Sequence, residues 1–461
     1  MKLLDKHLTR GRGSKTMTMT TLINCKFIDG AYWTLQISAG KISKVIHQPA
    51  LVTAPADAVR LANFTHGSTS QVVDAAGELI LPAGIDVHIH SRDPGLTHKE
   101  DWSAVAKGGF KGGVVAVCDM PNTKPATLTR ETVLEKARLA ASSGIDFGIY
   151  LGVGASNIGR VAELLGDRTL PICGVKVYYG QSTGDLMYSD LEALGRAMPK
   201  NDLGRMIVFH SEDQCCIDRN KVKISATMLS RPKGRFDFKA HSEIRSSEAA
   251  HASTRTILNW AQNYGRPIHI AHLSTPLELE LIAESRAKGV QVTSEVAPHH
   301  VLFSTDDYEE LGSRIKINPP VRSPDEVRQL RKLIGQGAVE VFATDHAPHT
   351  LEEKSGDVDS SPSGAPALEF YYPLLARVAE VCGLTMAKAL SMGASKPASL
   401  FGFDGLGSLE VGKTASFAWA KEEPFLVLDK EVVSKCGWTP YHGMTLPLKI
   451  EATWHRGQRV Y

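Results

Sequence analysis

The sequence predicts an α/β fold, a (β/α)8 TIM barrel with a small β-sandwich domain built from both termini. Three observations lead to this prediction. Short apolar runs separated by turn residues occupy both ends of the chain, as in antiparallel strands. Between the ends, nearly continuous apolar runs alternate with helical stretches, which indicates a parallel sheet with both faces buried. Eight such runs are present, the number that closes the barrel.

These patterns divide the chain into four segments. They are a disordered N-terminal extension at residues 1–20, the first part of the sandwich at 21–80, the barrel at 81–405 and the second part of the sandwich at 406–461. The extension is basic and rich in Thr and has no apolar core, so it makes a poor secretory signal. Asp-Gly, Ala-Gly and Arg-Gly pairs separate the apolar runs of both sandwich parts and predict turns.

The eight expected barrel strands are apolar runs of similar length. In chain order they are LPAGIDVHIH, GVVAVCDM, FGIYLGV, ICGVKVYY, RMIVFHSED, IHIAHLS, VQVTSEVAPH and VEVFATDHA. Helices are expected between the runs, among them residues 131–143, 276–289 and 325–335. The stretch 218–245 is rich in Arg and Lys and predicts a surface loop over the C-terminal mouth of the barrel, where barrel enzymes carry their sites.

Composition excludes several functional classes. The 461 residues carry a formal net charge of +2, and no concentrated basic run follows the first residues, so no nucleic-acid partner is expected. No apolar stretch reaches the length of a membrane span, so no membrane association is expected. Seven scattered cysteines do not suit a disulfide framework and favour a reducing compartment, which predicts a cytoplasmic protein.

Ionisable residues follow the expected barrel strands. His88 and His90 lie two positions apart on one strand and point to the same side, which suits a pair of Zn²⁺ ligands. For this pair alone, two inward histidines bonded to backbone carbonyls are the alternative. His210, His272 and Asp345 end later runs, and a buried carboxylate needs a metal or a base beside it. Together these five residues predict a metal site.

Lys176 lies inside an apolar strand, where an ammonium group is costly to bury. Two interpretations stay open. The side chain either reaches the rim or pairs with a carboxylate, or CO₂ converts it to a carbamate, an anionic ligand that bridges two cations.

Several longer motifs resemble those of one enzyme family. The segments DVHIHSRDPG, GGFKGGVVAVCDMPNTKP, FHSED, AHLST, KINPPVR and ATDHAPHTLEEK resemble the binuclear amidohydrolases, and specifically the dihydroorotases. The spacing from ATDHAPH to Lys354 is a specific signature, and the resemblance covers nearly the whole chain. GVKVYYGQSTGDL is similar to the carboxylated-lysine segment of the longer, multifunctional-type branch.

The resemblance implies a site with two Zn²⁺ ions. It places His88, His90 and Asp345 on one ion and His210 and His272 on the other. Lys176, carboxylated to N6-carboxylysine, and a hydroxide would bridge the ions. Asp345 would act as the general base and then as the general acid.

The resemblance also implies the substrate and its contacts. The reaction would be the reversible cyclisation of N-carbamoyl-L-aspartate to L-dihydroorotate in de novo pyrimidine (UMP) biosynthesis. Arg92, Asn122 and His349 would hold the substrate carboxylate. Asn318 would contact the ring edge, and Ala365 would supply a backbone contact. Taken singly, Arg92 could be a surface ion pair, and both asparagines could be turn or loop residues.

Two other functions are weighed against this one. A hydantoinase-like or allantoinase-like cyclic amidase would share the metal ligands but does not usually combine Arg92, Asn318 and His349. A non-catalytic barrel could instead scaffold aspartate transcarbamoylase. A homodimer or a complex with that enzyme is therefore a possible assembly. The pair His299 and His300 is expected to have a structural or supporting role and not to form a further metal site.

Overall fold

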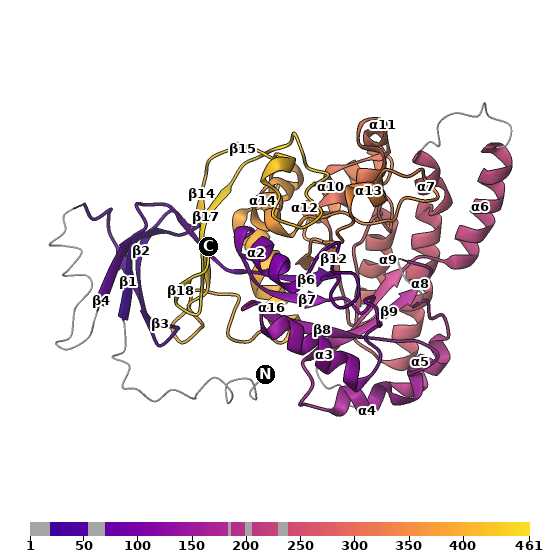
Figure 1. The fold of residues 1–461 in the computed structure, drawn as a ribbon, viewed down its shortest axis with the longest axis horizontal. Coiled ribbons are helices and arrows are strands. Elements are labelled where there is room, and N and C mark those ends of the chain that lie inside the picture. The colour runs from indigo at the N-terminus through magenta and orange to yellow at the C-terminus, as the bar shows by residue number, and fades with distance from the viewer. Residues whose placement is uncertain (1–18, 54–69, 183–185, 199–204, 229–237) are drawn as a thin grey trace.

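The computed structural model describes residues 19–53, 70–182, 186–198, 205–228 and 238–461. A sheet made from both ends of the chain lies at one side of the molecule, and the barrel with its helices fills the other (Figure 1). Most of the predicted N-terminal extension lies outside the described residues. Every described helix is too short or too polar to cross a lipid bilayer.

Eight parallel strands form the barrel, and each coincides with one of the predicted apolar runs, although β8 begins one residue before its run. They are β6 (Gly84–Ile89), β7 (Val114–Asp119), β8 (Asp146–Gly152), β9 (Ile172–Tyr179), β10 (Met206–Ser211), β11 (Ile268–Ile270), β12 (Val292–Val296) and β13 (Val341–Phe342), neighbours in this order. The first and last strands, β6 and β13, are joined just beyond their ends, where the His90 N–H donates to the His346 carbonyl over 2.8 Å. The predicted barrel is confirmed and is nearly closed.

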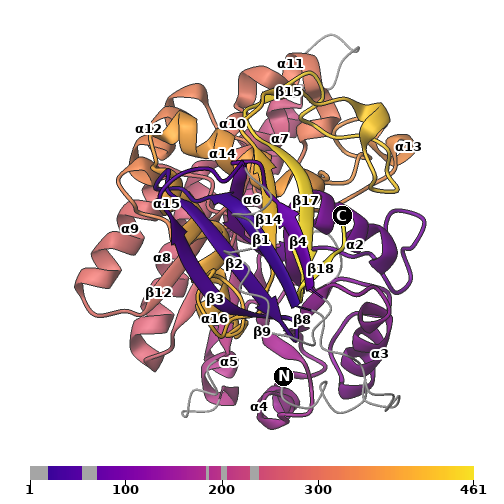
Figure 2. The same ribbon diagram turned by 90° about the vertical axis from the view of Figure 1, so that its left-hand side faces the viewer.

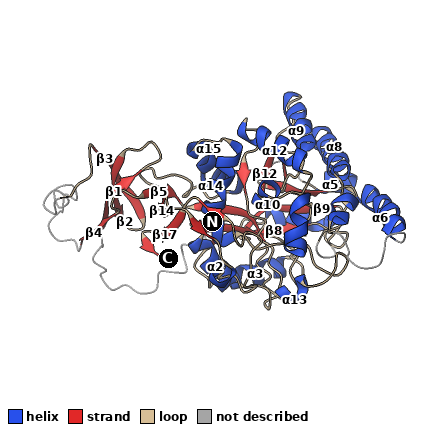
Figure 3. Ribbon diagram, turned by 90° about the horizontal axis from the view of Figure 1, so that it is seen from above, coloured by secondary structure: helices blue, strands red, loops and turns tan. Residues whose placement is uncertain are grey.

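Helices surround the barrel strands (Figure 3). They are α2 (Trp102–Lys111), α3 (Arg130–Ala141), α4 (Val161–Gly166), α5 (Leu191–Ala197), α6 (Gln214–Met228), α7 (Lys239–Ile244), α8 (Ser247–Tyr264), α9 (Pro276–Ala287), α10 (Pro298–Leu302), α11 (Tyr308–Leu311), α12 (Pro324–Gly335), α13 (Leu351–Lys354), α14 (Tyr371–Cys382), α15 (Met386–Leu390) and α16 (Lys396–Phe401). Capping boxes at Thr129, Thr275 and Ser323 start three of them. These three helices confirm the predicted ones, because local signals determine where they begin.

The prediction of a surface loop at 218–245 is wrong for the described part of that stretch. Its residues continue α6 and form α7, while residues 229–237 lie outside the described part of the chain. Asp213 Oδ1 accepts the Cys216 N–H over 2.7 Å at the start of α6. Lys and Arg are good helix formers as well as solvated residues, so charge content could not distinguish a helix from a loop.

Strands from both ends of the chain share one mixed sheet, which confirms a separate β unit built by the termini. They are β1 (Met19–Lys26), β2 (Tyr32–Ser38), β3 (Lys41–Gln48), β4 (Ser70–Asp74), β5 (Leu79–Pro82), β14 (Phe417–Lys421), β17 (Lys449–His455) and β18 (Gln458–Arg459). Phe417 on β14 pairs antiparallel with Pro82 on β5, so the two ends lie side by side (Figure 2). The domain boundaries drawn from the sequence stay a prediction.

The segment between β14 and β17 returns to the barrel. It contains the short strands β15 (Phe425–Leu426) and β16 (Thr445–Leu446), which pair with each other. The buried Trp438 indole donates from Nε1 to the His349 carbonyl over 2.7 Å. The Tyr441 ring stacks on Phe303, with centroids 5.4 Å apart. The C-terminal part of the chain therefore supports the loop that carries His349.

A buried ion pair joins α3 to the barrel. Lys136 Nζ lies 2.7 Å from Asp119 Oδ2, and both side chains are fully buried. The Ser91 N–H and hydroxyl also donate to the Asp119 carboxylate, over 2.7 and 2.8 Å. Ser91 thus links the end of β6 to the end of β7.

Replacing Lys136 with Met should lower the free energy of unfolding by about 3–5 kcal/mol, because it leaves the buried Asp119 carboxylate without its counter-ion. Urea unfolding measures this change. Lys107→Met, at an exposed lysine of α2, is the control and should stay within about 0.5 kcal/mol of the parent protein. Equal stability of the two variants would contradict the prediction.

Candidate active site

The predicted ligand residues meet at the C-terminal mouth of the barrel. His88, Lys176 and His210 lie on β6, β9 and β10, whereas His272 and Asp345 follow β11 and β13. All five side chains are buried. One ligand atom each from His88, His272 and Asp345 lies within 4.8 Å of the others, which makes these three a candidate metal site.

Two further histidines join this cluster. Asp345 Oδ1 lies 3.3 Å from both His88 Nε2 and His90 Nε2. His210 Nδ1 lies 3.1 Å from His272 Nε2. Imidazole nitrogens and a carboxylate oxygen that converge in this way are the donor set that Zn²⁺ prefers.

In His88 and His90, the ring nitrogen that points away from the cluster, Nδ1, contacts an acceptor oxygen. His88 Nδ1 is hydrogen-bonded to Glu295 Oε1, and His90 Nδ1 lies 2.6 Å from Asn122 Oδ1. A proton held on Nδ1 leaves the Nε2 lone pair facing the cluster, as metal-ligating histidines require. The arrangement therefore fits a metal ion.

Glu295, on β12, connects three histidines from below the cluster. Besides His88, it accepts from His269 Nε2 and from the backbone N–H of His272, each over 3.2 Å. Burial opposes ionisation of Glu295, but His88 and His269 outweigh it and hold the pKa of this carboxyl well below its ordinary value. Sequence reasoning missed Glu295, whose one local signal is a carboxylate inside an apolar run.

Glu212 plays a similar part for His210 and was also missed. Its Oε2 lies 3.1 Å from His210 Nε2 and accepts from Arg245 Nε over 3.0 Å. Burial raises the pKa of Glu212, yet the Arg245 charge and the His210 contact outweigh burial and lower it to about 2. An ionised Glu212 leaves His210 Nδ1 facing His272.

Replacing Glu295 with Gln should weaken metal affinity by about 10- to 100-fold, because the His88 ring loses the carboxylate that orients it. Competition against a fluorescent zinc chelator measures the dissociation constant. Glu340→Gln is a matched control, since Glu340 also contacts β12, through the Ser294 N–H at 3.0 Å, but does not touch a ligand histidine. Unchanged affinity in Glu295→Gln would contradict the orienting role.

Three residues of the site have left-handed backbone conformations. The φ angles are 62° at Arg92, 35° at His272 and 48° at Asp345. Such conformations cost roughly 1–3 kcal/mol in residues other than glycine and gather at functional sites. The position of these residues just past the strand ends and their strained backbone therefore direct the three side chains into the mouth of the barrel.

Lys176 is fully buried, and its Nζ has no hydrogen-bond partner among the described residues. The nitrogen lies 5.4 Å from the centroid of the Tyr178 ring. Burial lowers the pKa of Lys176 to about 8. A lysine that reaches the rim or pairs with a carboxylate is therefore not what the structure contains.

Arg92 lines the cavity beside the metal cluster, and His349 packs behind it. Arg92 is 2% exposed, and its guanidinium contacts the Pro348 carbonyl and His349 Nε2, each over 3.1 Å. Within the described part of the chain, no carboxylate pairs with this guanidinium. Lys99, which sequence reasoning did not single out, lies 3.1 Å from His349 Nδ1. Burial, together with Arg92 and Lys99, holds the pKa of His349 well below its ordinary value.

The remaining predicted substrate residues lie around the same mouth. Asn122 contacts His90 and lines the cavity, and Asn318 lines it with a buried Oδ1 that has no partner among the described residues. Ala365 is buried, and its carbonyl accepts the Ala347 N–H over 2.9 Å. The adjacent Gly364 lines the cavity in its place.

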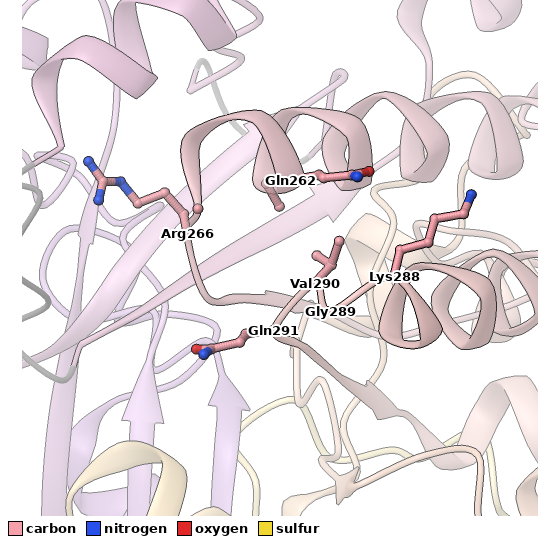
Figure 4. Close-up of a pocket in the computed structure, with 8 residues that line it drawn as sticks. Gln262, Arg266, Lys288, Gly289, Val290 and Gln291 are labelled. Atoms are coloured by element: carbon pink, nitrogen blue, oxygen red, sulfur yellow. The ribbon is translucent and has the colours of Figure 1, made fainter.

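One narrow cavity unites these groups. It is lined by His88, His90, Arg92, Asn122, Lys176, Tyr178, Ser182, His272, Asn318, Asp345, Ala347, Ser363 and Gly364. A second pocket lies where α8 and α9 end, and Gln262, Arg266, Lys288 and Gln291 line it (Figure 4). The described residues around that pocket include no carboxylate, histidine or cysteine, so acid–base and metal chemistry belongs to the first cavity.

The His299–His300 pair lies on α10 beside the cluster. The two ring centroids are 4.5 Å apart, and His300 lies 6.5 Å from His272 by the same measure. His300 Nε2 is bonded to the Pro319 carbonyl over 2.8 Å. A supporting role for the pair stays a prediction.

Comparison with known proteins agrees with this site. A family model described as "Amidohydrolase family" matches residues 79–460. The chain is 33% identical to a dihydroorotase of Methanosarcina mazei, covering 87% of each chain, and 34% identical to one of Halobacterium salinarum, covering 80% of this chain and 84% of that one. It is 27% identical to an allantoinase of Bacillus velezensis, covering 86% of each.

Among solved structures, the L-hydantoinase (dihydropyrimidinase) from Arthrobacter aurescens superposes with a TM-score of 0.84 at 24% identity, covering 96% of this chain and 95% of that one. This likeness supports the fold. The family model spans most of the chain, and the ligand cluster lies inside the matched region. The chain therefore belongs to the amidohydrolase family and is a hydrolase.

Proposed function

We propose that the protein is a dihydroorotase, which interconverts N-carbamoyl-L-aspartate and L-dihydroorotate. The observation that carries the proposal is the buried Arg92 guanidinium, which faces the cavity of the metal cluster with no carboxylate partner among the described residues. A buried charge needs a counter-ion, and a substrate carboxylate supplies one in bidentate geometry. The dihydroorotase relatives support the same substrate.

The chain's own residues would divide the work as follows. Arg92, Asn122 and His349 would hold the substrate carboxylate at one side of the cavity. Asp345 would accept a proton from the attacking water and return it to the leaving ring nitrogen. When bound, Zn²⁺ would lower the pKa of water and polarise the scissile carbonyl.

We propose two Zn²⁺ ions per chain, held by the residues that the sequence predicts. His88, His90 and Asp345 would hold one ion, and His210 and His272 the other. The buried Lys176 amine, which has no hydrogen-bond partner among the described residues, would as a carbamate supply an anionic ligand to the ions. With a pKa of about 8, about a tenth of this amine is neutral near pH 7, far more than for an ordinary lysine, and the neutral amine can form the bond to CO₂ and release a proton.

Metal removal tests the proposal. Protein treated with a chelator should lose turnover of dihydroorotate, and added Zn²⁺ should restore it, with about two ions per chain by elemental analysis. Hydantoin and allantoin serve as comparison substrates, because neither carries a carboxylate to pair with Arg92. Metal-loaded protein that hydrolyses either of these rings but ignores dihydroorotate would overturn the substrate assignment.

An allantoinase-like or hydantoinase-like activity is the second candidate, favoured by the allantoinase relative and by the hydantoinase structures. Arg92→Met separates the two functions. Loss of the guanidinium should raise the KM for dihydroorotate by about 10²-fold, since a charge-assisted bidentate contact is worth about 3 kcal/mol. An unchanged KM would favour a substrate without a carboxylate.

We also propose a cytoplasmic protein that forms a homodimer or associates with aspartate transcarbamoylase. A multifunctional protein CAD of Squalus acanthias is 30% identical over 83% of this chain, which covers 15% of that protein. Light scattering of the purified chain, with and without aspartate transcarbamoylase, tests the assembly.

A further inference from the structure

Tyr178 is a buried residue of the cavity. It is neither one of the proposed metal ligands nor one of the proposed contacts to the substrate carboxylate. It is 4% exposed, and its hydroxyl has no hydrogen-bond partner among the described residues. Its side chain lines the cavity together with Lys176, His272 and Asp345. A buried hydroxyl without a partner costs roughly 1–3 kcal/mol, so its retention in a substrate cavity points to a partner that arrives with the ligand.

The position of Tyr178 along β9 places it above the ligand layer. Lys176 and Tyr178 are two residues apart on the strand, so both side chains point into the barrel. Two strand residues span about 7 Å, which brings Tyr178 closer to the mouth than Lys176. A ligand entering from the mouth therefore reaches the phenol before it reaches the lysine.

Tyr178 lies beside His210 and within electrostatic reach of both Arg92 and Asp345. On the neighbouring strand, His210 pairs with Tyr178 in register, and their ring centroids are 6.1 Å apart. Arg92 and Asn122 instead follow β6 and β7. A substrate that pairs with Arg92 and reaches the ligand residues His272 and Asp345 would therefore lie within reach of Tyr178, which lines the same cavity.

We propose that Tyr178 is a catalytic residue whose hydroxyl donates a hydrogen bond to the oxygen of the reacting carbonyl. The inference rests on the proposed cyclic-amide chemistry. Negative charge grows on that oxygen as water adds to the carbonyl carbon, so a fixed donor is stronger in the transition state than in the ground state. The phenol is protonated at neutral pH and can donate without giving up its proton.

Tyr178→Phe removes only the hydroxyl oxygen and tests the proposal. The variant should lose about 10²- to 10³-fold in kcat, with KM within about threefold, since the contact forms mainly in the transition state. Its zinc content and melting temperature should equal those of the parent protein or exceed them, because no hydrogen bond of the free enzyme is lost. Tyr179→Phe is the matched control, because the adjacent half-buried side chain points to the opposite face, and it should retain kcat within about twofold.

The outcomes separate this inference from the proposed function. The parent protein is first assayed with dihydroorotate and with hydantoin, and the ring that it hydrolyses is used for both variants. If the parent protein hydrolyses hydantoin but not dihydroorotate, the dihydroorotase assignment is overturned, and the role of Tyr178 is then tested with hydantoin as the substrate. A kcat within threefold of the parent value, a loss confined to KM, or an equal loss in Tyr179→Phe would each overturn the role of Tyr178. A parent protein that hydrolyses neither ring would overturn both proposals.

Discussion

Asp345→Asn should lower kcat for dihydroorotate by about 10³-fold, within the range of 10² to 10⁴ that general acid–base groups contribute. Asp345 is 7% exposed and lies 3.3 Å from the Nε2 atoms of His88 and His90. Burial raises the pKa of Asp345 against the opposing charges of His88 and Lys176, which makes its carboxylate a stronger base. An amide keeps the shape of the side chain but cannot carry the proton.

The measurement must separate proton transfer from metal binding. Steady-state kinetics at saturating Zn²⁺, together with the zinc content of each sample, makes this separation. Asp359→Asn, at an exposed aspartate of a nearby loop, is the control and should keep full activity. If excess Zn²⁺ restores Asp345→Asn to near-normal kcat, Asp345 is a ligand and not the proton carrier.

Lys176→Ala should lose both bound metal and activity. Without the proposed carbamate, two cations that approach the same buried cavity would repel each other with no bridging anion between them. We expect zinc content to fall below about one ion per chain and kcat/KM to fall by at least about 10³-fold, equivalent to roughly 4 kcal/mol. Elemental analysis and kinetics on the same samples provide both numbers.

Short carboxylates offer a rescue that a purely structural lysine would not show. Formate or acetate fits the space left by the side chain and should restore part of the zinc content and part of the activity of Lys176→Ala. Intact-protein mass spectrometry of the parent at mild pH should show the added mass of CO₂. Lys107→Ala, at an exposed lysine, is the control for general effects of removing a lysine. Full zinc content in Lys176→Ala would rule out a bridging carbamate.

Motif spacing predicted much of the candidate site, because strand periodicity and strand ends are local properties. His88 and His90 could be assigned to one face from their two-residue spacing. The partners of these ligands could not be found in this way. Glu295 is 207 residues away from His88 in the chain and meets it only because β6 and β12 face the same barrel interior. No local pattern distinguishes such a carboxylate from any other at a strand end.

The stretch at 218–245 shows the opposite limit. Its charge content was compatible with a solvated loop and with a helix whose outer face is solvated, and the structure has helices. Arg245, at the end of α7, carries the interaction that matters there, because it reaches Glu212 behind His210. Side-chain composition predicted that this stretch is exposed to solvent. It predicted neither its helices nor the contact between Arg245 and Glu212.

By itself, the sequence determined the eight-strand pattern, the joining of both ends in a separate sheet, and the residue types that end the strands. Each of these depends on periodicity or composition within a short window. Only the tertiary structure decided that, among the described residues, Arg92 lacks a counter-ion and neither the Lys176 amine nor the Tyr178 hydroxyl has a hydrogen-bond partner, although all three residues line the same cavity. Whether a buried polar atom has a partner depends on every residue that folding brings near it, and these residues come from distant parts of the chain.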